Sequence, residues 1–152
     1  MRKKKQEITE LSDIENIIRQ SSVCHLAMSY ENNPYIIPLN FGYADGKLYF
    51  HCANEGMKLE YIEKNPRVCF SMILDKGLEI NDRPCNWSQF YRSVIGWGTA
   101  KILQDLDEKR NALLVLMSHY REQDWNIPDD KIAGVTLIQV DIHSMTGKHD
   151  GN

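Results

Sequence analysis

The sequence predicts a mainly β domain with helices (α+β class), folded as a small antiparallel barrel of about six strands and three helices. The chain has 152 residues, of which 42% are apolar and 26% are charged. These values are typical of one globular domain and argue against disorder. The strand candidates follow one another with few crossovers long enough for parallel pairing, so neighbouring strands are expected to be antiparallel.

The strand candidates are recognised by alternating or continuous apolar residues between turn signals. They cover residues 23–29, 35–43, 47–52, 67–74, 91–103 and 135–142. Asp45-Gly46, between the second and third candidates, is a strong signal for a two-residue hairpin turn. Gly96 and Gly98 bracket Trp97, which indicates a β-bulge or the close approach of another backbone or a ligand. Residues 77–88 are expected to form an irregular loop.

Three segments have apolar residues at helical spacing: 13–20, 54–65 and 105–120. Ser12 and Glu15 form a capping-box pattern at the first, and Pro66 ends the second. Asp105 and Asp107 are candidate caps for the third. Its apolar stripe is expected to face the core and consists of Leu106, Leu113, Leu114, Met117 and Tyr120.

Charge and hydropathy exclude several classes of protein. The 18 basic and 21 acidic side chains give a net charge of -3, which disfavours a general nucleic-acid-binding protein. The longest apolar run, 112–117, is too short to span a membrane. Residues 1–8 are expected to form a flexible, solvated tail. No signal-peptide segment follows the basic residues 1–5, so the expected compartment is the cytoplasm.

The cysteines and histidines show no catalytic or metal-binding spacing. Cys24, Cys52, Cys69 and Cys85 contain no CxxC pair, so reduced and mostly buried thiols are expected. The five histidines match no metal-ligand motif, and we expect no metal site. No serine–histidine–acid or cysteine–histidine set can be assembled from the spacing, so hydrolysis is not indicated.

The most informative stretch runs from residue 48 to residue 67. A strand ends near Cys52, the short link 53–56 follows, and a helix begins at once. The first free N–H groups of such a helix make an anion site, and the ammonium of Lys58 lies in the same turn. A bound phosphate would offset the unfavourable effect of the helix dipole on this cation. Lys58 could instead be a solvated lysine paired with Glu55 or Glu63.

Three further features each have a functional and a structural interpretation. Pro38, inside the 35–43 strand, leaves neighbouring backbone groups free for a flat heteroaromatic ligand, or simply marks an edge strand. The Tyr91-Arg92-Ser93 run could contact a phosphate and a stacked ring, or could alternate as outward polar residues. His51, at a strand end, could carry a proton or serve as a hydrogen-bonded structural residue.

Taken together, these segments resemble the FMN-binding split-barrel superfamily, which includes pyridoxamine 5'-phosphate oxidase. Within this superfamily, the chain is most similar to flavoproteins of the nitroimidazole-resistance type. The resemblance rests on the order and spacing of five runs: 38–43 (PLNFGY), 46–58 (GKLYFHCANEGMK), 65–70 (NPRVCF), 91–100 (YRSVIGWGTA) and 146–148 (TGK).

The resemblance implies a six-stranded antiparallel split β-barrel of the FMN-binding type over residues 1–152. It also implies a homodimer with FMN at the subunit interface. By the family pattern, the cofactor-binding residues are Ile37, Pro38, Leu39 and Asn40 beside the isoalloxazine ring, His51, Cys52 and Ala53 near the flavin and its ribityl chain, Lys58 at the phosphate, and Tyr91, Arg92 and Ser93 near the interface.

The activity implied by the resemblance is an FMN-dependent oxidoreductase of the nitroreductase kind. NADH or NADPH would reduce the flavin, and a small acceptor such as a nitroaromatic would reoxidise it. No catalytic residue is assigned, although His51 is a candidate proton donor. The chain has no arginine after Arg121, unlike the C-terminal segment of pyridoxamine 5'-phosphate oxidase, so vitamin B6 oxidation is not expected. No nucleic-acid or membrane partner is expected.

Two alternatives stay open. The barrel could be a non-catalytic module that binds flavin, or haem, for storage or sensing. A haem would need an axial ligand, for which His51, His143 and His149 are candidates. The barrel could also be an empty structural or interaction domain.

Overall fold

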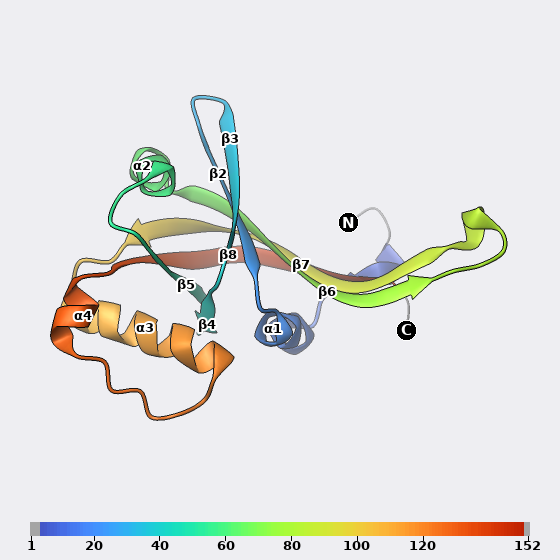
Figure 1. Cartoon of the computed structure of the whole chain (residues 1–152). Helices are drawn as coiled ribbons and strands as arrows, with labels where there is room; N and C mark the ends of the chain where they lie inside the picture. The colour runs from blue at the N-terminus through green and yellow to red at the C-terminus, as the bar shows by residue number, and fades with distance from the viewer. Residues whose placement is uncertain (1–3, 151–152) are drawn as a thin grey trace.

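The computed structural model describes residues 4–150 and shows one twisted antiparallel sheet flanked by helices (Figure 1). Along the sheet the strands follow the order β3-β2-β6-β7-β8-β5-β4, and β1 pairs with β8. The strands are β1 (Glu7–Ile8), β2 (Cys24–Tyr30), β3 (Asn33–Leu39), β4 (Gly42–Ala44), β5 (Lys47–Cys52), β6 (Arg67–Glu79), β7 (Ser88–Ile102) and β8 (Thr136–Asp150). Because β3 and β4 lie at the two ends of this order, the barrel is open, or split. This confirms the predicted fold class.

The strand count differs from the expected six because one predicted strand is broken and β1 was not foreseen. The 35–43 segment forms β3 and β4, separated at Asn40 and Phe41. The backbone N–H of Phe41 donates to the Tyr120 hydroxyl at 3.0 Å, so a helix side chain takes the place of a strand partner. A Cβ on Gly42 would lie 2.6 Å from the Leu116 backbone, so glycine allows the chain to cross the helix there.

Three strands differ in extent from the sequence-based expectation. β6 continues to Glu79 and β7 begins at Ser88, so most of the expected loop 77–88 forms a hairpin arm that projects away from the helices (Figure 1). β8 continues to Asp150 instead of ending at residue 142. β7 pairs with β6 on one side and with β8 on the other. These backbone hydrogen bonds extend the strands into segments whose apolar pattern is too weak to predict a strand.

The helices are α1 (Leu11–Gln20), α2 (Met57–Lys64), α3 (Leu106–Tyr120) and the unforeseen α4 (Asp129–Ala133). The expected capping box at Ser12 is not formed, because α1 begins after Glu10 without a side-chain cap. The cap expected for α3 is present: an Asp105 carboxylate oxygen accepts from the N–H groups of Asp107 and Glu108, each at 3.0 Å. Short 3-10 turns cover Lys4–Gln6 and Pro84–Asn86.

The core lies between the sheet and the helices. Phe41, Phe50 and Phe70 are fully buried, and α1 contributes Ile14, Ile17 and Ile18. A second buried cluster lies under α3 and consists of Tyr49, Leu103, Ala112 and Leu137. The buried face of α3 differs from the predicted stripe, since Ala112 and Leu116 are buried whereas Leu106 and Tyr120 are exposed.

The N-terminal segment also differs from the expected tail. Glu7 pairs with Lys148 and Ile8 pairs with Gly147, because the long β8 offers a free edge there. The remainder of the expected tail, residues 1–3, lies outside the described residues. Within residues 4–150, no helix combines the length and the hydropathy needed to cross a membrane.

Candidate functional site

The N-terminus of α2 has the features expected of an anion site. Gly56 begins the helix with φ of 130°, a backbone conformation that favours glycine, and no side chain caps the helix there. The carbonyl of Gly56 accepts from the N–H groups of Leu59 and Glu60. A Cβ on Gly56 would meet no atom within 4 Å, so open space lies beside the first turn. A phosphate therefore has room next to uncapped N–H groups.

Lys58 lies in this first turn and is half-buried. The alternative of an ion pair with Glu55 or Glu63 is not found, since none of the ion pairs within residues 4–150 involves Lys58. Burial raises the pKa of the Cys52 thiol, and the nearby Lys58 ammonium acts in the opposite direction on the same pKa. The charge of Lys58 is therefore close to the end of β5, where it is free to meet an anion.

The link between β5 and α2 is held in place by its own hydrogen bonds. The Thr136 hydroxyl donates to the Asn54 amide oxygen at 2.7 Å, and the Asn54 amide nitrogen donates to the Gly134 carbonyl at 3.4 Å. Ala53 is exposed, and His51 is exposed on β5 opposite Leu137. Strand alternation explains the position of His51, because its neighbour Phe50 is fully buried.

We call residues 37–40, which are predicted to lie beside the isoalloxazine ring, the platform. Those on β3 lie on two faces of the strand. Ile37 and Leu39 are half-buried and pack against the core, so only their backbone groups are available to a ligand outside the sheet. Pro38 is exposed and pairs with His25 on β2. Asn40 ends the platform, and its amide nitrogen donates to the Tyr120 hydroxyl at 3.1 Å and to the Ser22 carbonyl at 3.4 Å.

Tyr120 and His119, in the last turn of α3, hold this end of β3 in place; we call the two residues the latch. Tyr120 accepts from Phe41 and Asn40 and donates its hydroxyl hydrogen to the Ser22 carbonyl at 2.7 Å. His119 contacts the Ser21 carbonyl through Nε2 at 2.8 Å and packs on the Phe41 ring at 4.4 Å between centroids. Sequence reasoning placed Tyr120 in a core stripe and missed this role, because its partners lie about 80 to 100 residues away in the chain.

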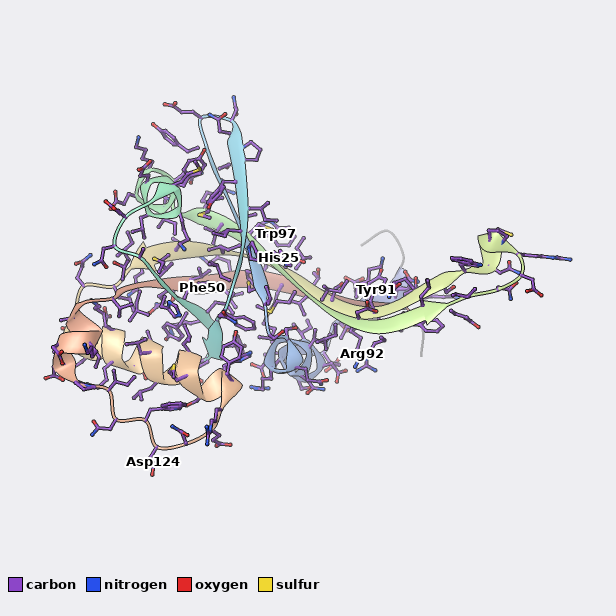
Figure 2. All side chains as sticks on the ribbon, viewed as in Figure 1. His25, Phe50, Tyr91, Arg92, Trp97 and Asp124 are labelled. Carbon is purple, nitrogen blue, oxygen red and sulfur yellow. The ribbon has the colours of Figure 1, made fainter. Side chains whose placement is uncertain are left out.

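Of the first eight predicted site residues, which we call the first region, Ile37, Leu39 and Cys52 pack against the core cluster that also contains Leu59 of α2. The last three predicted residues lie on β7, apart from α2. Core contacts join β3, the end of β5 and α2, and Tyr35 on β3 meets Tyr61 on α2 at 5.7 Å between ring centroids. Tyr91, Arg92 and Ser93 lie toward the arm on β7, and Figure 2 shows Tyr91 and Arg92 nearer to the arm than Phe50.

The second group has contacts of its own. The Lys148 ammonium lies 5.1 Å from the centroid of the Tyr91 ring. Arg92 lines a hollow of about 430 Å³ beside Glu7, Asp13 and His149. Ser93 pairs with Ile73 on one side. The surface that contains Tyr91, Arg92 and Ser93 is therefore separate from the surface that contains Lys58.

The thiols and acidic groups of residues 4–150 are dispersed over the fold. Within residues 4–150, no group of three or more histidine, cysteine or acidic side chains could hold a metal ion. Cys24 is buried, Cys52 and Cys69 are half-buried, Cys85 is exposed, and all four thiols are free. Burial raises the pKa of Cys24 to about 12, so this thiol is neutral at physiological pH.

The open antiparallel sheet, with α2 at the end of β5, defines a split-barrel protein of the pyridoxamine 5'-phosphate oxidase class. A family model for pyridoxamine 5'-phosphate oxidase matches residues 10–149. The chain belongs to this family. A search of curated proteins finds no match.

Solved structures share the fold over nearly the whole chain. A candidate 5-nitroimidazole antibiotic resistance protein from Bacteroides thetaiotaomicron is 32% identical, with a TM-score of 0.82 over 95% of this chain and 90% of that chain. The flavocytochrome Anf3 from Azotobacter vinelandii is 18% identical, with a TM-score of 0.84 over 100% of this chain and 72% of that chain. An FAD- and haem-binding protein from Mycobacterium smegmatis is 18% identical, with a TM-score of 0.84 over 97% and 74%. At 18% identity, the last two show the fold alone.

Proposed function

We propose that this protein is an FMN-dependent oxidoreductase, in which NADH or NADPH reduces the flavin and a small acceptor such as a nitroaromatic reoxidises it. The observation that carries the proposal is the uncapped N-terminus of α2, where Gly56 leaves open space and Lys58 has no ion-pair partner. The name of the relative at 32% identity supports the choice of acceptor.

The residues of the first region fit FMN. Lys58 and the first N–H groups of α2 would hold the phosphate, because an ammonium and the positive end of a helix both attract an anion. The link 53–56 and the exposed side of Cys52 would border the ribityl chain. The backbone of residues 37–40 would lie beside the isoalloxazine ring, and Tyr120 would fix the end of that segment. When bound, FMN supplies the redox chemistry, and the protein supplies position and electrostatics.

We also propose a homodimer with FMN at the interface. Ser93 lies seven residues along β7 from Ala100, whose N–H donates to the Pro66 carbonyl just beyond α2. At about 3.3 Å per strand residue this is about 23 Å, so Tyr91, Arg92 and Ser93 are too far along β7 to share a flavin with Lys58 of the same chain. A second copy can supply them, and a ligand shared between two copies stabilises their association.

The proposed compartment is the cytoplasm. Its support is the set of four free thiols, since cysteines that could pair are usually oxidised in secreted proteins.

The first test is an absorbance spectrum of the purified protein, recorded before and after adding NADH or NADPH without oxygen. Flavin bands that bleach, and that return when a nitroaromatic is added, support the proposal and identify the donor. Flavin bands that persist with both donors contradict the oxidoreductase and favour a flavin-storage or sensing module. A haem Soret band favours the haem-binding alternative. A colourless protein that does not bind added FMN favours an empty barrel.

A further inference from the structure

Beyond Asp75 and Tyr91, the hairpin arm is a two-stranded ribbon. β2 pairs with β6 only at residues 69–71, and β8 pairs with β7 only from Tyr91 onward. Within residues 4–150, the two strands of the arm therefore pair only with each other, and Figure 1 shows the arm projecting away from the helices. An isolated two-stranded hairpin is marginally stable in water, so the arm needs a further surface to pack against.

A β-bulge decides which side chains lie on each face of the arm. The register between β6 and β7 shifts between the pairs 75–91 and 77–90, which leaves Lys76 as an extra residue on β6. Gly77 follows with φ of 107°, a conformation that favours glycine. One oxygen of the Asp75 carboxylate accepts from the Gly77 N–H at 2.8 Å and from the Gln89 amide nitrogen at 2.5 Å. The bulge is therefore fixed by hydrogen bonds.

The bulge places apolar side chains on one face of the arm. We call the face of β6 and β7 that carries the exposed Ile73 and Ile95 the outer face. Side chains alternate along a strand, so a shift of one residue moves every later side chain to the other face. Without the bulge, the outer face would continue through Gly77. With the bulge, Leu78 takes that position, 51% exposed, and Ile80 follows two residues later, 68% exposed.

Trp87 adds a fixed aromatic ring at the tip of the arm. Its indole N–H donates to the Asn81 carbonyl at 2.6 Å, and its backbone N–H donates to the Pro84 carbonyl at 3.2 Å. The side chain is still 47% exposed. Because its polar N–H already has a partner, the indole offers an apolar surface, and tryptophan is among the residues that contribute most to protein interfaces.

We propose that the arm packs against a second copy of this chain through Leu78, Ile80 and Trp87. The second copy is favoured over another protein because the apolar face of the arm continues the face that carries Ile73. Ile73 pairs with Ser93, which the proposed flavin site needs from a second copy. The inference rests on the proposed homodimer and adds the arm to its interface. In a symmetric dimer each arm reaches the other copy, so the contact is made twice.

The test is the dissociation constant of the dimer, measured by sedimentation equilibrium on the full chain as purified, a readout that needs no flavin turnover. We expect Leu78→Lys to raise this constant at least about tenfold, because its ammonium would be buried unpaired in the interface. Ser88→Lys is the matched control. It adds the same charge to the arm on the opposite face, where Ser88 pairs with Glu79, and should dimerise like the wild type. Thermal unfolding shows that each variant is folded.

Hydrogen exchange locates the contact. We expect the amides of residues 77–90 to exchange at least about tenfold more slowly in the wild-type dimer than in Ile95→Lys, at a concentration where that variant is a monomer, because packing opposes local opening of the ribbon. Equal exchange of these amides in dimer and monomer would overturn the arm contact.

The remaining outcomes separate the arm contact from the proposed activity. No difference in dimerisation between Leu78→Lys and Ser88→Lys overturns the arm contact and leaves the oxidoreductase intact. A dimer that Leu78→Lys alone weakens, but whose flavin neither NADH nor NADPH bleaches, supports the arm contact and overturns the oxidoreductase. A monomeric wild type overturns the arm contact together with the homodimer.

Discussion

Lys58 lies in the first turn of α2, next to the open space beside Gly56. A cation in the first turn of a helix is disfavoured by the helix dipole, yet Lys58 is half-buried there and has no carboxylate partner within the described residues. Gly56 adds an unusual backbone conformation at the same place, with φ of 130°. The unpaired cation in the first turn costs stability in the free protein. A bound phosphate would compensate for this cost.

We expect Lys58→Ala to weaken FMN binding by about 1.5–3 kcal/mol, or about ten- to a hundredfold, because it removes a charge-assisted contact with the phosphate. Fluorescence titration of the apoprotein with FMN measures this change. Lys64→Ala on the same helix is the control, since Lys64 is exposed at the last turn and its ammonium lies 4.8 Å from the Tyr30 ring centroid. Equal FMN affinities of the two variants would remove Lys58 from the site.

At the scale of elements, the latch at the end of α3 determines where the β3 platform stops. Asn40 and Phe41 leave the sheet because Tyr120 offers them a hydrogen-bond acceptor, and the Phe41 ring packs beneath His119. The same hydroxyl donates to the Ser22 carbonyl just before β2. One side chain therefore joins α3, the end of β3 and the segment that leads into β2. The platform is held from outside the proposed flavin region.

We expect Tyr120→Phe to lower the free energy of unfolding by about 1–3 kcal/mol, because the partly buried N–H of Phe41 loses its acceptor. We also expect weaker FMN binding, since the end of the platform becomes less ordered. Urea denaturation and FMN titration measure the two effects.

Tyr61→Phe is the matched control for Tyr120→Phe. The Tyr61 ring packs on Tyr30 and Tyr35, but none of the hydrogen bonds described within residues 4–150 involves its hydroxyl. This variant should change neither quantity. If Tyr120→Phe also leaves the free energy of unfolding and the FMN affinity unchanged, the latch does not stabilise the platform.

At the scale of the whole molecule, the long strands carry an apolar outer face that residues 4–150 leave exposed. Ile73 is 56% exposed and Ile95 is 40% exposed on the same side of β6 and β7. Ser93, one of the residues that the proposed flavin site needs from a second copy, pairs directly with Ile73. The exposed apolar face and the displaced half of the site therefore coincide, which favours association through this face.

We expect light scattering on a gel-filtration column to find a dimer, and Ile95→Lys to weaken dimerisation by about tenfold or more, because the ammonium would be buried unpaired in the interface. FMN affinity should fall with it. Leu11→Lys on α1, which changes a residue 57% exposed away from this face, should leave both unchanged. A wild-type monomer that binds FMN fully would contradict the shared site.

The stability of the whole fold is expected to fall in alkaline solution. Burial raises the pKa of Cys24 from 9.0 to about 12, and burial together with the hydrogen bond to Glu15 raises the pKa of Tyr43 from 10.0 to about 12. Above about pH 9 the unfolded chain releases protons that the folded chain retains, so the free energy of unfolding decreases as the pH rises. These contributions are fully present below pH 9 and are lost as the pH approaches 12.

Urea denaturation between pH 8 and pH 11.5 measures this decrease. Tyr43→Phe removes one of the two groups, so its stability should depend less steeply on pH above pH 10 than that of the wild type. Parallel curves for the two proteins would show that Tyr43 does not titrate differently in the folded and unfolded states.

Local patterns were sufficient for much of the fold. Residues 47–52 form β5 with the predicted bounds, and the turn before it has positive φ at both Asp45 and Gly46, as the preferred two-residue hairpin requires. Asp105 caps α3 as predicted, and the glycines around Trp97 accompany a bulge. In each case the information lies within a few neighbouring residues.

The fold class and the position of Lys58 in the first turn of α2 follow from the residue pattern, because periodicity, capping and turn chemistry act over short distances. The family follows from the order and spacing of the five matching runs. The residue pattern does not give the end of β3 at Leu39, the hydrogen bond between Tyr120 and Asn40, or the separation of Ser93 from Lys58, all of which arise in the folded chain. These features depend on contacts between residues distant in the chain. Burial and hydrogen-bond partners there are set by packing, which no local pattern encodes.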